Sequence, residues 1–165
     1  MSSDILAALR THRWQKTHLR YNIVPPEDRV TKVYKSGKPM TTIRRGIHSQ
    51  SLREGGLYEL ILSNAPERPD GDWRVTINRN IECHPHTDRG NIGKSFICFL
   101  GDYEGGELCF EDGTVIAERN RWHAIDGSIL HWNNPITSGT KYSAILFNRA
   151  PRARYGIGAQ ATLAT

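Results

Sequence analysis

Two histidines and an aspartate in this sequence have the types and spacing to hold a metal ion. His86 and Asp88 stand two residues apart, shortly before the apolar run at 95–100. In an extended segment, side chains two residues apart point to the same face, so both can reach one ion. His131, which is flanked by apolar residues, is the candidate for a third ligand. Two imidazoles and one carboxylate that leave coordination positions open are typical of non-haem Fe(II) sites that react with O2.

A cation and a hydroxyl follow the third candidate ligand. Lys141 stands ten residues after His131, and Ser143 comes two residues later, just before the apolar stretch 144–147. An ammonium group neutralises a carboxylate, and a hydroxyl donates a hydrogen bond to it. We therefore expect this pair to bind a carboxylate ligand. Cys83 and His84 leave another interpretation open, a zinc-binding cupin in which they are additional ligands.

The segments around these residues predict many short strands and two helices. Apolar periodicity predicts one helix that starts near Ser3-Asp4 and a second within 49–64, whose glycines place its start near Leu57. Glycine-bearing turns are expected at 101–106, 112–113, 126–127 and 138–139. The expected strands are 19–24, 30–34, 40–47, 73–78, 94–100, 107–110, 114–117, 122–125, 128–132 and 141–148. We therefore predict a mainly β fold, a jelly-roll core with supporting N-terminal helices.

The five residues His86, Asp88, His131, Lys141 and Ser143 together resemble the pattern of the Fe(II)/2-oxoglutarate dioxygenase superfamily. Members have His-x-Asp, a distal His, then Arg or Lys about ten residues later and Ser two further on. The resemblance implies that the first three residues bind Fe(II) and that the last two hold the distal carboxylate of 2-oxoglutarate. It also implies O2 as the oxidant and a double-stranded β-helix (cupin-like) fold.

A narrower resemblance, over about 73–148, is to the TET/JBP group of nucleic-acid base dioxygenases, and within it to compact algal and phage-like members. It rests on His-x-Asp-x-x-Asn-x-Gly-x-Ser at 86–95, on Leu-Gly-Asp-Tyr-Glu-Gly-Gly-Glu-Leu at 100–108, and on Gly-Thr-Lys-Tyr-Ser at 139–143. This resemblance implies that Asn91 contacts a flipped pyrimidine. An amide can pair with a base edge because it offers both a donor and an acceptor. A purely local role in a turn is the other interpretation of Asn91.

Charge and aromatic residues supply candidates for contacts with a nucleic acid. The net charge of +5 fits an anionic partner. Trp132 could stack on a base, although a strand tryptophan also suits a core position. Arg89 could bind phosphate or 2-oxoglutarate, or it could simply be solvated. The candidates for phosphate contacts are Arg44, Arg45, Arg79, Arg89 and Lys94.

The sequence thus predicts a dioxygenase that hydroxylates a C–H bond and releases succinate and CO2. The favoured target is the methyl group of 5-methylcytosine or thymine in a nucleic acid, with DNA expected before RNA. Two other functions stay open. One is protein hydroxylation of the prolyl type, where the Gly-Gly-Glu-Leu turn and a lysine at the 2-oxoglutarate position also occur. The other is a non-catalytic jelly-roll binding module.

The length and composition predict one domain over residues 1–150, with a catalytic core at about 73–148 and a basic, flexible tail at 151–165. The three cysteines lack the spacing of a disulfide framework, which predicts a reducing, intracellular setting. No apolar run approaches the length of a membrane span, so we expect a soluble protein without a membrane partner.

Overall fold

The protein is described from a computed structural model. The structure describes residues 2–17, 19–23, 29–33, 35–43, 55–67 and 73–149. Several predictions made from the sequence lie outside these residues: Arg44 and Arg45, the end of the expected strand 40–47, the first part of the expected helix 49–64, and the tail 151–165.

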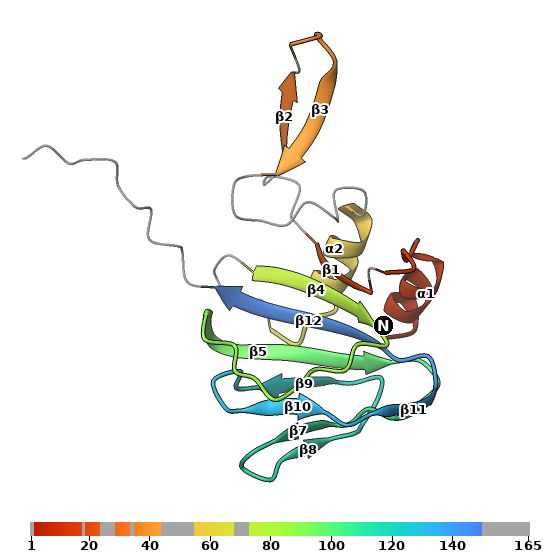
Figure 1. Ribbon diagram of the computed structural model, residues 1–165, viewed down its shortest axis with the longest axis vertical. Helices are drawn as coiled ribbons and strands as arrows, with labels where there is room; N and C mark the ends of the chain where they lie inside the picture. Colours follow the sequence, from red (N-terminus) through yellow and green to blue (C-terminus); the bar gives the residue numbers. More distant parts are fainter. Residues whose placement is uncertain are drawn as a thin grey trace, which may run out of the picture.

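The centre of the fold is a five-stranded antiparallel sheet in the order β1-β4-β12-β5-β9 (Figure 1). The central strand β12 pairs with β4 on one side and β5 on the other, so that Ala144 stands opposite both Ile77 and Cys98. The last strand in the described part of the chain therefore lies between two strands that come earlier in the sequence. The strands are Arg20–Ile23 (β1), Trp73–Arg79 (β4), Asn91–Leu100 (β5), Trp122–Ile125 (β9) and Tyr142–Arg149 (β12).

A smaller antiparallel sheet, in the order β10-β7-β8, packs against one face of the large sheet across an apolar layer. Its strands are His131–Asn133 (β10), Leu108–Phe110 (β7) and Val115–Ile116 (β8). Two more strands, Tyr103–Gly105 (β6) and Ile136–Gly139 (β11), pair with each other beside it. Ile97 and Phe99 of β5 meet Leu108 and Phe110 of β7 in the layer between the sheets. Two stacked antiparallel sheets form the predicted jelly roll.

Two helices cover the other face of the large sheet. Helix α1 (Ser2–Thr11) buries Ile5 and Leu9, and helix α2 (Gly55–Ser63) buries Ile61 in the same apolar cluster. No helix in the described part of the chain is both long and apolar enough to cross a membrane.

Alternation along the strands decides which side chains can form a site. Val75 and Ile77 of β4, like Ala144 and Leu146 of β12, lie in the cluster under the helices. Because neighbouring strand residues point to opposite faces, Asn78 and Ser143 point to the face that the small sheet covers. Polar residues of the large sheet are thereby directed into the space between the two sheets.

A separate hairpin joins Arg29–Val33 (β2) to Pro39–Ile43 (β3). These two strands form a sheet of their own, which stands apart from the jelly roll in Figure 1.

The structure differs from the sequence-based expectation at four strands, one of which is β5, which begins at Asn91 and not at Lys94. The segments 101–106 and 138–139 were expected to be turns, yet they contribute to β6 and β11, whose pairing is non-local. Strand β10 begins at His131 rather than at Ser128, because the carboxylate of Asp126 accepts hydrogen bonds from the backbone N–H (2.9 Å) and hydroxyl (2.6 Å) of Ser128. Those two bonds hold the chain in an Asx turn until just before the strand begins.

Candidate metal and carboxylate site

Backbone hydrogen bonds bring the two candidate histidines together. His86 lies in the connection between β4 and β5, and it forms an isolated antiparallel bridge with His131 at the start of β10. The N–H of each residue donates a 3.0 Å bond to the carbonyl of the other. The two rings consequently lie with their centroids 4.3 Å apart, although 45 positions separate them in the sequence.

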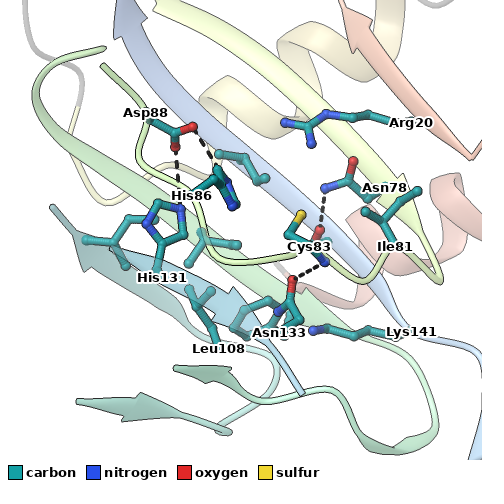
Figure 2. A pocket seen from close by; sticks show the side chains of 15 residues that line it. Arg20, Asn78, Ile81, Cys83, His86, Asp88, Leu108, His131, Asn133 and Lys141 are labelled. Atoms are coloured by element: carbon teal, nitrogen blue, oxygen red, sulfur yellow. Dashed lines mark hydrogen bonds and ion pairs between the residues drawn. The ribbon is translucent and has the colours of Figure 1, made fainter. Parts of the chain in front are cut away.

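Asp88 completes a group of three side chains at the same place. Its Oδ1 lies 3.8 Å from Nε2 of His86, and its Oδ2 lies 3.7 Å from Nε2 of His131 (Figure 2). The three potential ligand atoms all lie within 4.8 Å of one another. Within the described residues, this is the group of His, Cys, Asp or Glu side chains with the geometry to hold a metal ion. His84 and Cys83 are not part of it.

The histidine rings are oriented for metal binding through Nε2. Nδ1 of His86 lies 2.7 Å from the carbonyl of His84, and Nδ1 of His131 lies 2.7 Å from the carbonyl of Ile129. Because a carbonyl can only accept, the proton of each neutral ring resides on Nδ1 and Nε2 presents a lone pair. This arrangement, in which the second ring nitrogen donates to a carbonyl, is the usual support of a metal-binding histidine.

The turn before β10 positions Asp88. The Asp88 N–H donates a 2.7 Å hydrogen bond to the carbonyl of Gly127. A Cβ at position 127 would lie 3.0 Å from the Cβ of Asp88 and 3.2 Å from its Oδ2. A larger residue at position 127 would therefore push against the Asp88 side chain, which would have to shift by a few tenths of an ångström.

Lys141 and Ser143 lie in the same pocket as the three candidate ligands (Figure 2). Lys141 is only 4% exposed and Ser143 only 6%. The Nζ of Lys141 donates to the carbonyl of Gly106 and sits 4.3 Å from the ring centroid of Phe99. Burial lowers the pKa of Lys141 to about 8, partly opposed by the nearby Cys83, Glu107 and Glu82. A buried cation without a salt-bridge partner in the described part of the chain is a suitable receptor for an anionic ligand.

The pocket therefore has two chemically different ends joined by apolar walls. His86, Asp88 and His131 form one end in Figure 2, and Lys141 lies towards the other. The apolar residues between and around them are Ile81, Ile97, Phe99, Leu108, Ile125 and Ile145. Such walls limit the access of water and strengthen electrostatic interactions inside the pocket.

Other residues singled out in the sequence lie away from the pocket wall. Asn91 begins β5 and lines a neighbouring surface hollow together with Lys94 and Ser128. Arg89 is exposed in the turn between Asp88 and Asn91. Trp132 is half-buried in β10 and, as the neighbour of His131, points to the opposite face of the strand. The roles predicted for these residues remain predictions.

Arg20 and Asn78 are pocket residues that the sequence analysis did not identify. Arg20 stands opposite Asn78 in the β1–β4 pairing, and Asn78 stands opposite Ser143 in the β4–β12 pairing. Residues opposite one another in a sheet share a face, so the three side chains form a row. Arg20 and Asn78 lie in the expected strands 19–24 and 73–78, but the strand pairing that aligns their side chains with Ser143 could not be read from local patterns.

No protein-family model and no curated protein matches the sequence. Among solved structures, a 2OG-Fe(II) oxygenase family protein from Burkholderia pseudomallei is similar over 92% of this chain and 80% of its own, with a TM-score of 0.58 and 17% identity. The fold is a double-stranded β-helix. At this identity the likeness establishes the fold alone, and it confirms the mainly β, jelly-roll prediction.

Two further solved structures are similar to about half of this chain. NgTET1 in complex with 5mC DNA matches over 46% of this chain with a TM-score of 0.43 and 19% identity. The match covers 33% of the length of that protein. An RmlC-like cupin protein from Desulfovibrio desulfuricans matches over 48% of this chain and 76% of its own, with a TM-score of 0.34 and 18% identity.

Proposed function

We propose that this chain is an Fe(II)- and 2-oxoglutarate-dependent dioxygenase that hydroxylates the methyl group of a 5-methylpyrimidine in nucleic acid. One observation carries the proposal: a single pocket combines three side chains that could together hold a metal ion with a buried lysine and serine. This combination suits a small acid that chelates a metal with one end and presents a carboxylate at the other. 2-Oxoglutarate is such an acid.

The three ligand residues fit Fe(II) by their chemistry. His86 and His131 offer Nε2 lone pairs whose direction is set by the hydrogen bonds of Nδ1, and Asp88 offers a carboxylate between them. Two imidazoles and one carboxylate form the facial set that suits non-haem Fe(II) and leaves positions open. Fe(II) bound there, with 2-oxoglutarate and O2, supplies the oxidising power for C–H hydroxylation, and the cosubstrate leaves as succinate and CO2.

The chain's own residues bind and orient the cosubstrate. The Lys141 ammonium neutralises its distal carboxylate, and the Ser143 hydroxyl donates a hydrogen bond to it. Arg20, on the same wall, adds a second cation near this end. Phe99, Leu108 and Ile145 keep the space between carboxylate and metal apolar.

The nucleic-acid substrate is supported by the sequence motif around Asn91 and by the basic charge. Asn91 lies close to the metal ligands, because its N–H donates a 3.1 Å bond to the carbonyl of Asp88. Its side-chain amide makes only a 3.5 Å contact with the hydroxyl of Ser95, which a base edge can replace. A base in a duplex would have to be flipped out to reach such a site.

The decisive test measures succinate and oxidised product together. Purified protein with Fe(II), 2-oxoglutarate and O2 is incubated with 5-methylcytosine-containing oligonucleotides or with proline-rich peptides, and both are analysed by mass spectrometry. We expect an oxidised methyl group on the oligonucleotide, complete loss of turnover in Asp88→Ala, and unchanged turnover in Glu111→Ala, an exposed acid outside the pocket. Asn91→Ala should lose base oxidation while retaining uncoupled succinate formation.

Each alternative gives a different result. Hydroxylated peptide with untouched oligonucleotides would replace the base substrate by a protein substrate. A protein that binds neither metal nor 2-oxoglutarate, and forms no succinate, would contradict the dioxygenase proposal itself and favour a binding module.

A further inference from the structure

The positive charge of the chain is concentrated in its N-terminal part. Residues 1–45 contain ten Lys and Arg but three Asp and Glu, whereas residues 73–149, which hold the pocket, contain eight and nine. The part of the chain that surrounds the pocket is therefore close to neutral. Attraction for a polyanion has to come mainly from the N-terminal part.

Within this part, the β2–β3 hairpin is basic and lacks any acid of its own. From Arg29 to Ile43 it contains four basic residues and no Asp or Glu. Lys35 and Lys38, in the connection between the strands, are exposed. Figure 1 shows the hairpin standing apart from the large sheet and its helices. The four basic residues are Arg29, Lys32, Lys35 and Lys38.

The shape of the hairpin suits a nucleic-acid groove. A two-stranded ribbon is one of the elements that the major groove of duplex DNA admits. An isolated hairpin is only marginally stable in water, so contacts with a partner would stabilise it. The hairpin also contains no Trp, Phe or Leu, the side chains that anchor a basic segment in a lipid interface. These properties favour nucleic acid over a membrane.

The hairpin is also connected closely to the pocket. Strand β1, whose Arg20 lines the pocket, ends at Ile23, and β2 begins at Arg29. Nine residues lead from Arg20 to Arg29, and at roughly 3.3 Å per residue they span at most about 30 Å. One turn of duplex is about 34 Å long. A single nucleic acid can therefore contact the hairpin and present a base to the pocket.

We propose that the β2–β3 hairpin is a nucleic-acid-binding arm, and that the exposed Lys35 and Lys38 contact the phosphates of the substrate. This inference rests on the proposed function for its choice of partner, but binding can be measured without any oxidation.

The test compares two double variants that lose the same charge. Lys35→Gln with Lys38→Gln removes two cations from the hairpin, and Arg13→Gln with Arg121→Gln removes two exposed cations elsewhere. Binding to a labelled duplex of about 25 base pairs is measured by fluorescence anisotropy over a range of salt concentrations. We expect the hairpin variant to bind the duplex about tenfold more weakly than wild type. The slope of the logarithm of its binding constant against the logarithm of the salt concentration should be smaller in magnitude by about two. The affinity of the control variant for the duplex should change less than about twofold.

Uncoupled conversion of 2-oxoglutarate to succinate serves as the second measurement and should be equal in all three proteins. An unchanged affinity and salt slope in the hairpin variant would overturn the inference, as would tighter binding of wild type to phosphatidylserine vesicles or to an acidic peptide than to DNA. If DNA binding depends on the hairpin but no base is oxidised, the proposed substrate is wrong and the proposed role of the hairpin is supported. If bases are oxidised equally well by wild type and the hairpin variant, the proposed substrate is supported and the role of the hairpin is wrong.

Discussion

The side-chain amide of Asn78 donates a 3.0 Å hydrogen bond to the hydroxyl of Ser143, and both residues are buried in the pocket wall. They face each other across β4 and β12, and Arg20 continues the row on β1. Because Asn78 donates to the Ser143 oxygen, the Ser143 proton is left to donate elsewhere. The strand pairing thus orients the serine hydroxyl as a donor towards a carboxylate.

Replacing Asn78 should weaken 2-oxoglutarate binding without stopping the reaction. In Asn78→Ala the Ser143 hydroxyl is no longer fixed, and the loss of about 1 kcal/mol corresponds to a roughly fivefold higher KM for 2-oxoglutarate. We expect kcat to stay within about twofold of wild type, because Asn78 touches neither the metal ligands nor the substrate. Steady-state succinate formation at varied 2-oxoglutarate concentration measures both quantities.

Thr76→Val is the matched control for Asn78→Ala. Thr76 lies on the same face of β4 and donates a 2.6 Å hydrogen bond to Asn22, but it does not line the pocket. Its loss should leave the KM for 2-oxoglutarate unchanged. A similar rise of KM in both variants would show that general weakening of the sheet, and not the Asn78–Ser143 bond, is responsible.

Arg20 should contribute to 2-oxoglutarate binding through long-range charge. Its side chain is exposed and has no carboxylate partner among the described residues. In Arg20→Gln we expect the KM for 2-oxoglutarate to rise about three- to fivefold at low salt, since an exposed cation contributes at most about 1 kcal/mol. The effect should largely disappear near 0.5 M salt, where screening is strong.

Arg121→Gln, which removes an exposed cation outside the pocket wall, should not change the KM at either salt concentration. An Arg20→Gln effect that persists at high salt would indicate a direct, buried contact. No effect at low salt would remove Arg20 from the cosubstrate site.

The buried Lys141 predicts a pH-dependent affinity for 2-oxoglutarate. Burial lowers its pKa to about 8, so the free protein carries the ammonium below that pH and loses it above. The value of kcat/KM for 2-oxoglutarate should be constant below about pH 8. Above that pH it should decrease, by a factor that approaches about ten for each further pH unit. Because the unfolded lysine stays protonated up to a higher pH, the ligand-free protein should become more stable as the pH rises above 8.

Lys141→Arg provides the control for this pH dependence. An arginine remains charged throughout the range, so its kcat/KM should not fall near pH 8, whatever its absolute value. A fall that is the same in wild type and Lys141→Arg would assign the titration to another group.

The sequence correctly predicted features that depend on residues close together in the chain. His86 and Asp88 share a face because they are two residues apart. The helix expected to start near Ser3-Asp4 begins at Ser2. Strand β9 has the predicted bounds, 122–125, since the turn residues on either side of this segment determine where a strand can begin and end.

The features that were missed depend on pairing between distant segments. Strands β6 and β11 have three and four residues, contain glycine, and exist because they pair across about 30 positions. Arg20 and Asn78 enter the pocket because β1 pairs with β4, which places residues 58 positions apart side by side. Local propensity carries no information about such a register, so the second cation of the pocket could not be predicted.

Gly127 should be required for metal affinity although it offers no ligand atom. An alanine Cβ there would lie 3.0 Å from the Cβ of Asp88, tighter than about nine in ten such contacts, so the turn or the carboxylate must shift by a few tenths of an ångström. Displacement of a supporting group typically costs about 10- to 100-fold in metal affinity. We therefore expect Gly127→Ala to bind Mn(II), used as a redox-stable substitute for Fe(II), at least tenfold more weakly in calorimetric titration.

Gly56→Ala is the control, because a Cβ there meets nothing within 4 Å. A helical alanine should leave the metal affinity unchanged while raising the free energy of unfolding by about 0.5–1 kcal/mol. If Gly127→Ala retains the wild-type affinity and a native circular dichroism spectrum, the close approach of this turn does not position Asp88.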